Sequence, residues 1–223
     1  MSDVTTVRKS IRGSAAGMGA SRAGHPAKAP TFTETARREQ LIELTIGLIA
    51  EHGLRGITLS RIAAAAGITN AAVIYFFGTK NAVIEAACQR VLGEVVGTTS
   101  AAVEQASTAR AGVDAYVRSL AGYLSAHPKQ LRVIIEMASA SRAGISSGDG
   151  MDARLASRWP PVAALIQAAQ AAGDIRPLDA RTTAITLIGA VDAIFAESIT
   201  DHDYDLLDAI EVVLEQFDRA VRP

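Results

Sequence analysis

Residue patterns that support catalysis or metal binding are sparse in this sequence. No spacing of His, Cys, Asp or Glu matches a zinc or di-iron site on a helix, and no glycine-rich phosphate loop, nucleophile elbow or pair of catalytic carboxylates is present. The triplet Asp201-His202-Asp203 is better explained as the acidic start of the last helix than as a metal site. We therefore predict that the chain is not an enzyme and holds no cofactor or metal.

Charged residues are distributed unevenly, although the formal net charge is only -1. Residues 1–80 carry ten Lys or Arg against five Asp or Glu, whereas residues 81–223 carry twelve against eighteen. Lys and Arg neutralise phosphates and supply most of the non-specific affinity for nucleic acid. The N-terminal third therefore favours a polyanionic partner.

The composition predicts a helical globular protein. Hydrophobic residues make up 49% of the 223 residues and aromatic residues only 4%, and many stretches are rich in alanine, which favours helix over strand. The single cysteine, Cys88, excludes an internal disulfide framework and fits a reducing cytoplasm; on a stretch rich in Ala and Val it is expected to be a small buried hydrophobe. No apolar run reaches about 18 residues, so no membrane span is expected.

Residues 1–33 are rich in Gly, Ser and Ala and contain five basic residues but only Asp3 as an acid. This composition predicts a basic, flexible tail. The tail either adds phosphate contacts or is a passive extension. An organellar transit peptide is a weaker alternative, because the glycine content disfavours an amphipathic helix.

Four helices are predicted in the next stretch. The first covers residues 35–52 and ends at Gly53; a short one follows Thr58 as its N-cap and ends at Gly67. Thr69 caps a third helix over residues 70–76, and Thr79 caps a fourth. Two short helices joined by a tight glycine turn and braced by a longer helix are typical of a helix-turn-helix.

The stretch from Arg38 through Lys80 resembles the N-terminal DNA-binding domain of the TetR family of transcriptional regulators. The resemblance rests on the segments LIELTIGLIAEHG, GITLSRIAAAAGIT and IYFFGTK. It departs from the family pattern at Ile74, where a tyrosine is usual, and at Gly78, where a lysine is usual. The resemblance implies an all-α fold, with an N-terminal three-helix helix-turn-helix DNA-binding domain over residues 34–80 and a helical ligand-binding and dimerisation domain over residues 81–223.

Asn70 is the only polar side chain near the start of the predicted recognition helix that is able to make a two-point base contact, which suits adenine. Neighbouring alanines can touch a thymine methyl, and other groups fix the register on phosphates. Val73 and Phe77 are expected in the core, Tyr75 faces DNA, and Phe76 is undecided. The candidate DNA-binding residues are Ser60, Thr69, Asn70, Ala71, Ala72, Ile74, Tyr75 and Lys80.

The remaining chain is predicted to be helical throughout. The expected helices are residues 80–98, 102–126, 128–141, 151–172, 179–200 and 204–221, with a loop at 144–150. Trp159-Pro160-Pro161 is expected to bend the helix that begins near Met151. The resemblance implies an effector pocket in this part, although each candidate is also explained as ordinary core. The candidate lining residues are Tyr116, Leu120, Tyr123, Ile134, Met137, Trp159 and Ile166.

The last two helices carry apolar stripes at three-four spacing. A second copy of the chain would bury the same stripe twice, which predicts a four-helix dimer interface; an internal core is the alternative. The predicted interface residues are Leu187, Val191, Ile194, Phe195, Ile210, Val213, Leu214 and Phe217.

These patterns and the family resemblance together predict a cytoplasmic, homodimeric transcriptional regulator that binds a palindromic operator in double-stranded DNA. The resemblance implies a repressor that a small effector releases, and the few charges in the predicted buried stripes favour a largely apolar effector. Two alternatives remain: an activator, or an all-helical enzyme or ligand-binding protein with an incidental helix-turn-helix.

Overall fold

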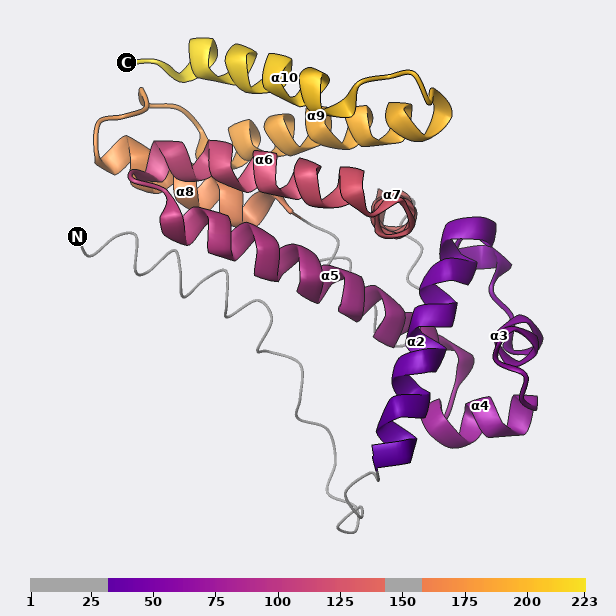
Figure 1. Ribbon diagram of the computed structural model, residues 1–223. Coiled ribbons are helices and arrows are strands. Elements are labelled where there is room, and N and C mark those ends of the chain that lie inside the picture. Colours follow the sequence, from indigo (N-terminus) through magenta and orange to yellow (C-terminus); the bar gives the residue numbers. More distant parts are fainter. Residues whose placement is uncertain (1–31, 143–157) are drawn as a thin grey trace. The chain divides into compact units, whose positions relative to one another are not determined.

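The computed structural model describes residues 32–142 and 158–223, which are helical and contain no strand (Figure 1). This confirms the predicted all-α fold. The elements are α2 (Phe32–His52), the 3-10 turn η1 (Leu54–Gly56), α3 (Leu59–Ala66), α4 (Asn70–Phe77), α5 (Lys80–Gln105), α6 (Ala109–Ala126), α7 (Pro128–Arg142), α8 (Trp159–Ala171), α9 (Ala180–Thr200) and α10 (Leu206–Val221).

Short polar side chains define where most of these helices begin. The hydroxyl of Thr58 accepts a hydrogen bond from Arg61 N, and that of Thr69 accepts one from Ala72 N. Thr79 does the same at the start of α5. Each side chain satisfies a backbone N–H that has no partner within its helix. The three predicted threonine caps are confirmed.

Several predicted boundaries are wrong. α5 continues to Gln105 instead of stopping near residue 98, and α6 begins only at Ala109, after its cap Thr108. Asp201-His202-Asp203 lies between α9 and α10, and Asp205 caps α10 instead. Pro160 and Pro161 stand in the first turn of α8, where a missing N–H costs nothing, so they begin the helix and do not bend it. The predicted tail of residues 1–33 ends too late, because Phe32 and Thr33 belong to α2. Residues 1–31, the predicted loop at 144–150 and the predicted helix start at 151–157 lie outside the described residues.

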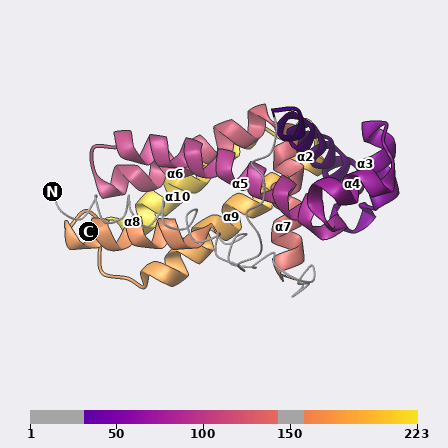
Figure 2. The same cartoon turned by 90° about the horizontal axis from the view of Figure 1, so that it is seen from below.

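Contacts divide the described chain into two units. The reader unit contains α2, α3, α4, α5 up to Leu92 and α7 from Arg132; the bundle unit contains the rest of α5 with α6, α8, α9 and α10. In the reader unit α2 packs against both α3 and α4 (Figure 2). Cys88 is buried, and burial raises the pKa of its thiol to about 12, as expected of an inert core residue. The reader core includes Leu41, Ile46, Ile49, Ile62 and Val73.

The bundle unit is a four-helix bundle. α6 packs on α8, α8 on α9, α9 on α10, and α10 on α6, which closes the cycle (Figures 1 and 2). Arg158 is buried and pairs with Asp192, so its charge is neutralised inside the bundle.

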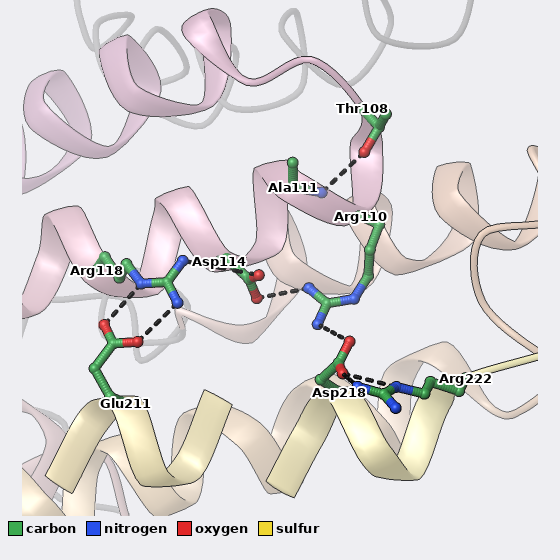
Figure 3. Close-up of polar contacts among 8 residues, drawn as sticks. All are labelled: Thr108, Arg110, Ala111, Asp114, Arg118, Glu211, Asp218 and Arg222. Atoms are coloured by element: carbon green, nitrogen blue, oxygen red, sulfur yellow. Dashed lines mark hydrogen bonds and ion pairs between the residues drawn. The ribbon is translucent and has the colours of Figure 1, made fainter. Parts of the chain in front are cut away.

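A line of ion pairs joins α6 to α10 on the surface of the bundle (Figure 3). Arg118 forms a bidentate pair with Glu211 at 2.7 Å for both hydrogen bonds. Arg110 contacts Asp114 at 2.6 Å and Asp218 at 3.1 Å. These pairs set the register of α10 along α6.

α9 is long and apolar enough to cross a membrane by length and composition, with a mean hydropathy of 1.4 over its most apolar 18 residues. In the bundle it instead packs between α8 and α10, and a third of that window is buried.

Candidate nucleic-acid interface

α3 and α4 are the two helices of a helix-turn-helix, and residues 67–69 form the turn between them. The chain changes direction by 101° between them, within the range of about 90–120° that is typical of this motif. Gly67 adopts φ 63° and ψ 35°, a left-handed conformation that is cheapest for glycine. Ile68 N bonds to Ala63 O at 3.0 Å across the turn, while Ile62, Ala63 and Val73 are buried against the unit's core.

The buried residues leave the other side of α4 in solvent. Asn70 and Ala71 are exposed, as are Ile74 with 38% and Tyr75 with 72% of its surface accessible. Ser60 is exposed at the start of α3. The structure therefore gathers these five predicted residues around the beginning and outer side of α4.

The other three predicted DNA-binding residues are half-buried or already form a hydrogen bond within the protein. Thr69 is exposed, but its hydroxyl caps α4. Ala72 and Lys80 are half-buried. Thr69 and Lys80 still stand at helix starts, where backbone N–H groups favour phosphate oxygens.

A hydrogen bond joins the two helices on this face. Asn70 Nδ2 donates to Ser60 Oγ at 3.3 Å. The side chain with the best capacity for a two-point base contact is thus oriented by the preceding helix.

Tyr75 has a partner that the sequence did not indicate. Its hydroxyl donates to Glu34 Oε1 at 3.0 Å, and Glu34 lies in the first turn of α2. This hydrogen bond and the nearby negative charge raise the pKa of Tyr75. The ring packs edge-on against Phe76 at a centroid distance of 5.2 Å.

The aromatic predictions are confirmed in part. Val73 is fully buried as predicted, and Tyr75 is exposed, as a ring that faces DNA must be. Phe77 is only half-buried, so its assignment to the core is wrong. The guanidinium of Arg38 lies 4.4 Å from the Phe77 ring centroid and also bonds to Phe76 O. Sequence reasoning missed Arg38, because nothing in the spacing of α2 shows which cation covers the end of α4.

A carboxylate from α7 reaches the turn that follows α2. Glu136 Oε2 accepts a hydrogen bond from Leu54 N at 3.0 Å, across 82 positions of the chain. Gly53, with φ 68° and ψ 166°, makes room for it: a Cβ there would lie 2.9 Å from Glu136 Oε2. No local pattern predicts this contact, since its partners come from distant segments.

The charge of the described helix-turn-helix is nearly balanced. Residues 32–80 carry five Lys or Arg against four Glu. Most of the positive excess noted in the sequence therefore belongs to residues 1–31, which lie outside the described residues.

The predicted effector-lining residues are divided between the two units. Tyr116, Leu120 and Ile166 are buried in the bundle unit, where burial raises the pKa of Tyr116 to about 12. Tyr123 and Trp159 are half-buried in the same unit. The other two, Ile134 and Met137, are buried in α7 of the reader unit.

The predicted dimer residues lie in the chain's own core. Seven of the eight are buried without a second copy, and Val213 is half-buried. They pack where α9 and α10 meet the rest of the bundle, which is the internal-core alternative. An apolar stripe shows that a helix face is covered but not which surface covers it. The buried seven are Leu187, Val191, Ile194, Phe195, Ile210, Leu214 and Phe217.

Comparison with known proteins agrees with this geometry. Residues 41–87 match the family model described as bacterial regulatory proteins, tetR family. The HTH-type transcriptional regulator BetI of Rhizobium meliloti (strain 1021) is 32% identical over 85 residues, covering 38% of this chain and 42% of BetI. The chain thus matches less than half the length of this relative.

Solved structures extend the likeness to most of the chain at the level of fold. SmeT, the repressor of the Stenotrophomonas maltophilia multidrug efflux pump SmeDEF, superposes with a TM-score of 0.67 at 20% identity, covering 83% of this chain and 90% of SmeT. The regulator FadR of Bacillus subtilis, solved with stearoyl-CoA, gives 0.66 at 18% identity over 80% and 96% of the two chains.

Proposed function

We propose that this chain is a transcriptional regulator of the TetR family that binds a palindromic DNA operator as a homodimer in the cytoplasm, because residues 41–87 match the model of that family. Residues 34–80 bind DNA, and residues 81–223 bind an effector and a second copy of the chain. We assign no catalytic activity, since the similar proteins described above are named as regulators.

The observation that carries this proposal is the geometry of α3 and α4. The 101° turn at Gly67 presents the outer side of α4 with Asn70, Ala71 and Tyr75 in solvent. A helix presented in this way fits the major groove, where base edges are distinguishable.

A homodimer is supported by the surface of the bundle. The side of α9 that faces solvent carries Ile185, Gly189, Ala193 and Ala196, and Ile185 is 45% exposed. Small residues let a second helix approach closely, so this face replaces the buried stripe as the proposed interface. A dimer also positions two recognition helices for the two halves of a palindrome.

The proposed effector is small and largely apolar, and its binding releases the operator. The apolar core of the bundle supports this class, as does FadR, which was solved with stearoyl-CoA. Repression is the proposed outcome, by analogy with SmeT.

The test is selection of bound fragments from the source genome, followed by gel-shift titration and in vitro transcription on the selected site. Ala71→Glu adds a negative charge to the exposed side of α4 and is expected to reduce affinity at least tenfold. Ala126→Glu, at an exposed position of α6, is the matched control and retains binding. Equal binding by both variants contradicts the assigned interface, and binding that no apolar ligand weakens contradicts the regulatory half.

A further inference from the structure

Ser60 and Asn70 have no role in holding their own helices. Thr58 already caps α3, and Thr69 already caps α4. Within the described part of the chain, these two exposed side chains form a hydrogen bond with each other and with no other residue. A polar pair that spans two helices, yet is not needed to begin either, is available for another task.

The donors and acceptors of this pair specify that task. The Asn70 amide has two N–H groups and one oxygen, and one N–H is given to Ser60 Oγ. The remaining N–H and Oδ1 form the donor and acceptor pattern that complements N7 and the amino group of adenine. The Ser60 hydroxyl accepts from Asn70 and keeps its own proton for another acceptor.

The single proton of Ser60 determines which way the amide faces. If Ser60 donates to a phosphate oxygen, it can only accept from Asn70, so the NH2 group must point toward it. If the amide were flipped, Oδ1 would need the serine proton and the phosphate contact would be lost. Phosphate binding and amide orientation are therefore coupled through one hydroxyl group.

We infer that Ser60 is a positioning residue for base recognition: it holds the Asn70 amide in the orientation that reads adenine while donating its proton to a backbone phosphate. The inference rests on the proposed DNA-binding function. Positioning matters here because Ala71 and Ala72 add no hydrogen-bonding side chain to the first turn of α4. An amide that is oriented before binding loses less conformational freedom in the complex.

The experiment measures base preference and not affinity alone. The full chain is titrated by fluorescence anisotropy against the best duplex selected from a randomised pool, and against duplexes changed at one base pair. Asn70→Ala identifies the adenine that it reads, with an expected loss of adenine preference of about tenfold. Ser60→Ala is expected to lose about three- to tenfold of the same preference, and Ser60→Thr, which keeps a hydroxyl, to restore most of it.

Further variants separate positioning from other roles. In the Asn70→Ala background, Ser60→Ala leaves base preference unchanged, because no amide remains to be oriented. Ser125→Ala, an exposed serine on α6, is the matched control and leaves both affinity and preference unchanged. Thermal unfolding confirms that each variant is folded.

Three outcomes would overturn the inference. If Ser60→Ala weakens binding to all duplexes by one factor, Ser60 is only a phosphate contact. If Asn70→Ala changes no base preference while the chain still binds duplex DNA, the amide does not read adenine and the proposed function stands. If the unchanged chain binds no duplex, both the inference and the proposed function fail.

Discussion

At Tyr75, one hydroxyl proton has two possible acceptors. In the free protein it is donated to Glu34, and a phosphate contact requires the same proton. Glu34 also places a negative charge beside the surface that would face DNA. Glu34→Gln is therefore expected to raise operator affinity by about two- to fivefold at low salt and less at high salt.

Gel-shift titration over a range of salt concentrations measures this effect. Glu51→Gln removes the same charge from an exposed residue at the other end of α2 and is the control. Weaker binding by Glu34→Gln would show instead that Glu34 holds Tyr75 in its DNA-binding position.

Both the backbone conformation at position 53 and the side chain of Glu136 beside it favour glycine there. Its φ of 68° and ψ of 166° are accessible almost only to glycine, and a Cβ would collide with Glu136. Gly53→Ala is expected to lower the free energy of unfolding by about 1–3 kcal/mol. Gly47→Ala, in the middle of α2 with no atom within 4 Å of the new Cβ, should raise it by about 0.5–1 kcal/mol. Urea unfolding measures the free energy of unfolding of both variants. If Gly53→Ala and Gly47→Ala change it equally, the strain assigned to Gly53 is contradicted.

At the scale of elements, the ion pairs between α6 and α10 make stability depend on pH (Figure 3). Hydrogen bonds from Arg222 and Arg110 lower the pKa of Asp218, and one from Arg118 lowers the pKa of Glu211, from ordinary values of 3.8 and 4.5. A carboxyl whose folded pKa is lowered stabilises the fold above its unfolded pKa, and this contribution is lost as pH falls through the folded value. Stability from these pairs should therefore decline below about pH 4.5.

The two central arginines should differ in importance. Arg110 is 14% exposed, pairs with Asp114 and Asp218, and lies 5.0 Å from the Phe217 ring, whereas Arg118 is 50% exposed. Arg110→Ala is expected to cost about 1–3 kcal/mol and Arg118→Ala about 0.5 kcal/mol. Thermal unfolding at neutral pH and below pH 4 tests both values. A pH dependence that neither substitution changes would contradict the assignment.

The elements themselves could largely be predicted, because their causes are local. Thr58, Gly67 and Thr69 mark helix ends through bonds to residues three or four positions away. The contacts of Glu136 and Arg38 could not be predicted, since each joins segments that only the fold brings together. Phe77 was misplaced for the same reason.

The sequence also does not predict which helices cover an apolar surface. The spacing of the apolar stripes on α9 and α10 predicts that they are buried, and the structure covers them with the chain's own helices. Their spacing is the same whether a helix of the same chain or of another one covers them.

At the scale of the whole molecule, the proposed recognition of a palindrome requires two copies of the chain. One α4 has eight residues and reads only part of a site, so a monomer should bind an operator weakly. The exposed side of α9, around Gly189 and Ala193, is the proposed contact between copies. Ala193→Arg places a long charged side chain there while leaving the buried side of α9 unchanged.

Ala193→Arg is therefore expected to convert the dimer to a monomer that unfolds at nearly the same temperature but binds the palindrome at least tenfold more weakly. Ala126→Arg adds the same charge at an exposed position of α6 and should remain dimeric. Analytical ultracentrifugation and gel-shift titration read out the two properties separately. If the Ala193→Arg variant is still a dimer, the interface does not lie on α9. If the variant is a monomer with unchanged affinity, a single α4 recognises DNA without a second copy. Because a dimer gains affinity from two half-sites at once, loss of the interface and loss of affinity should occur together.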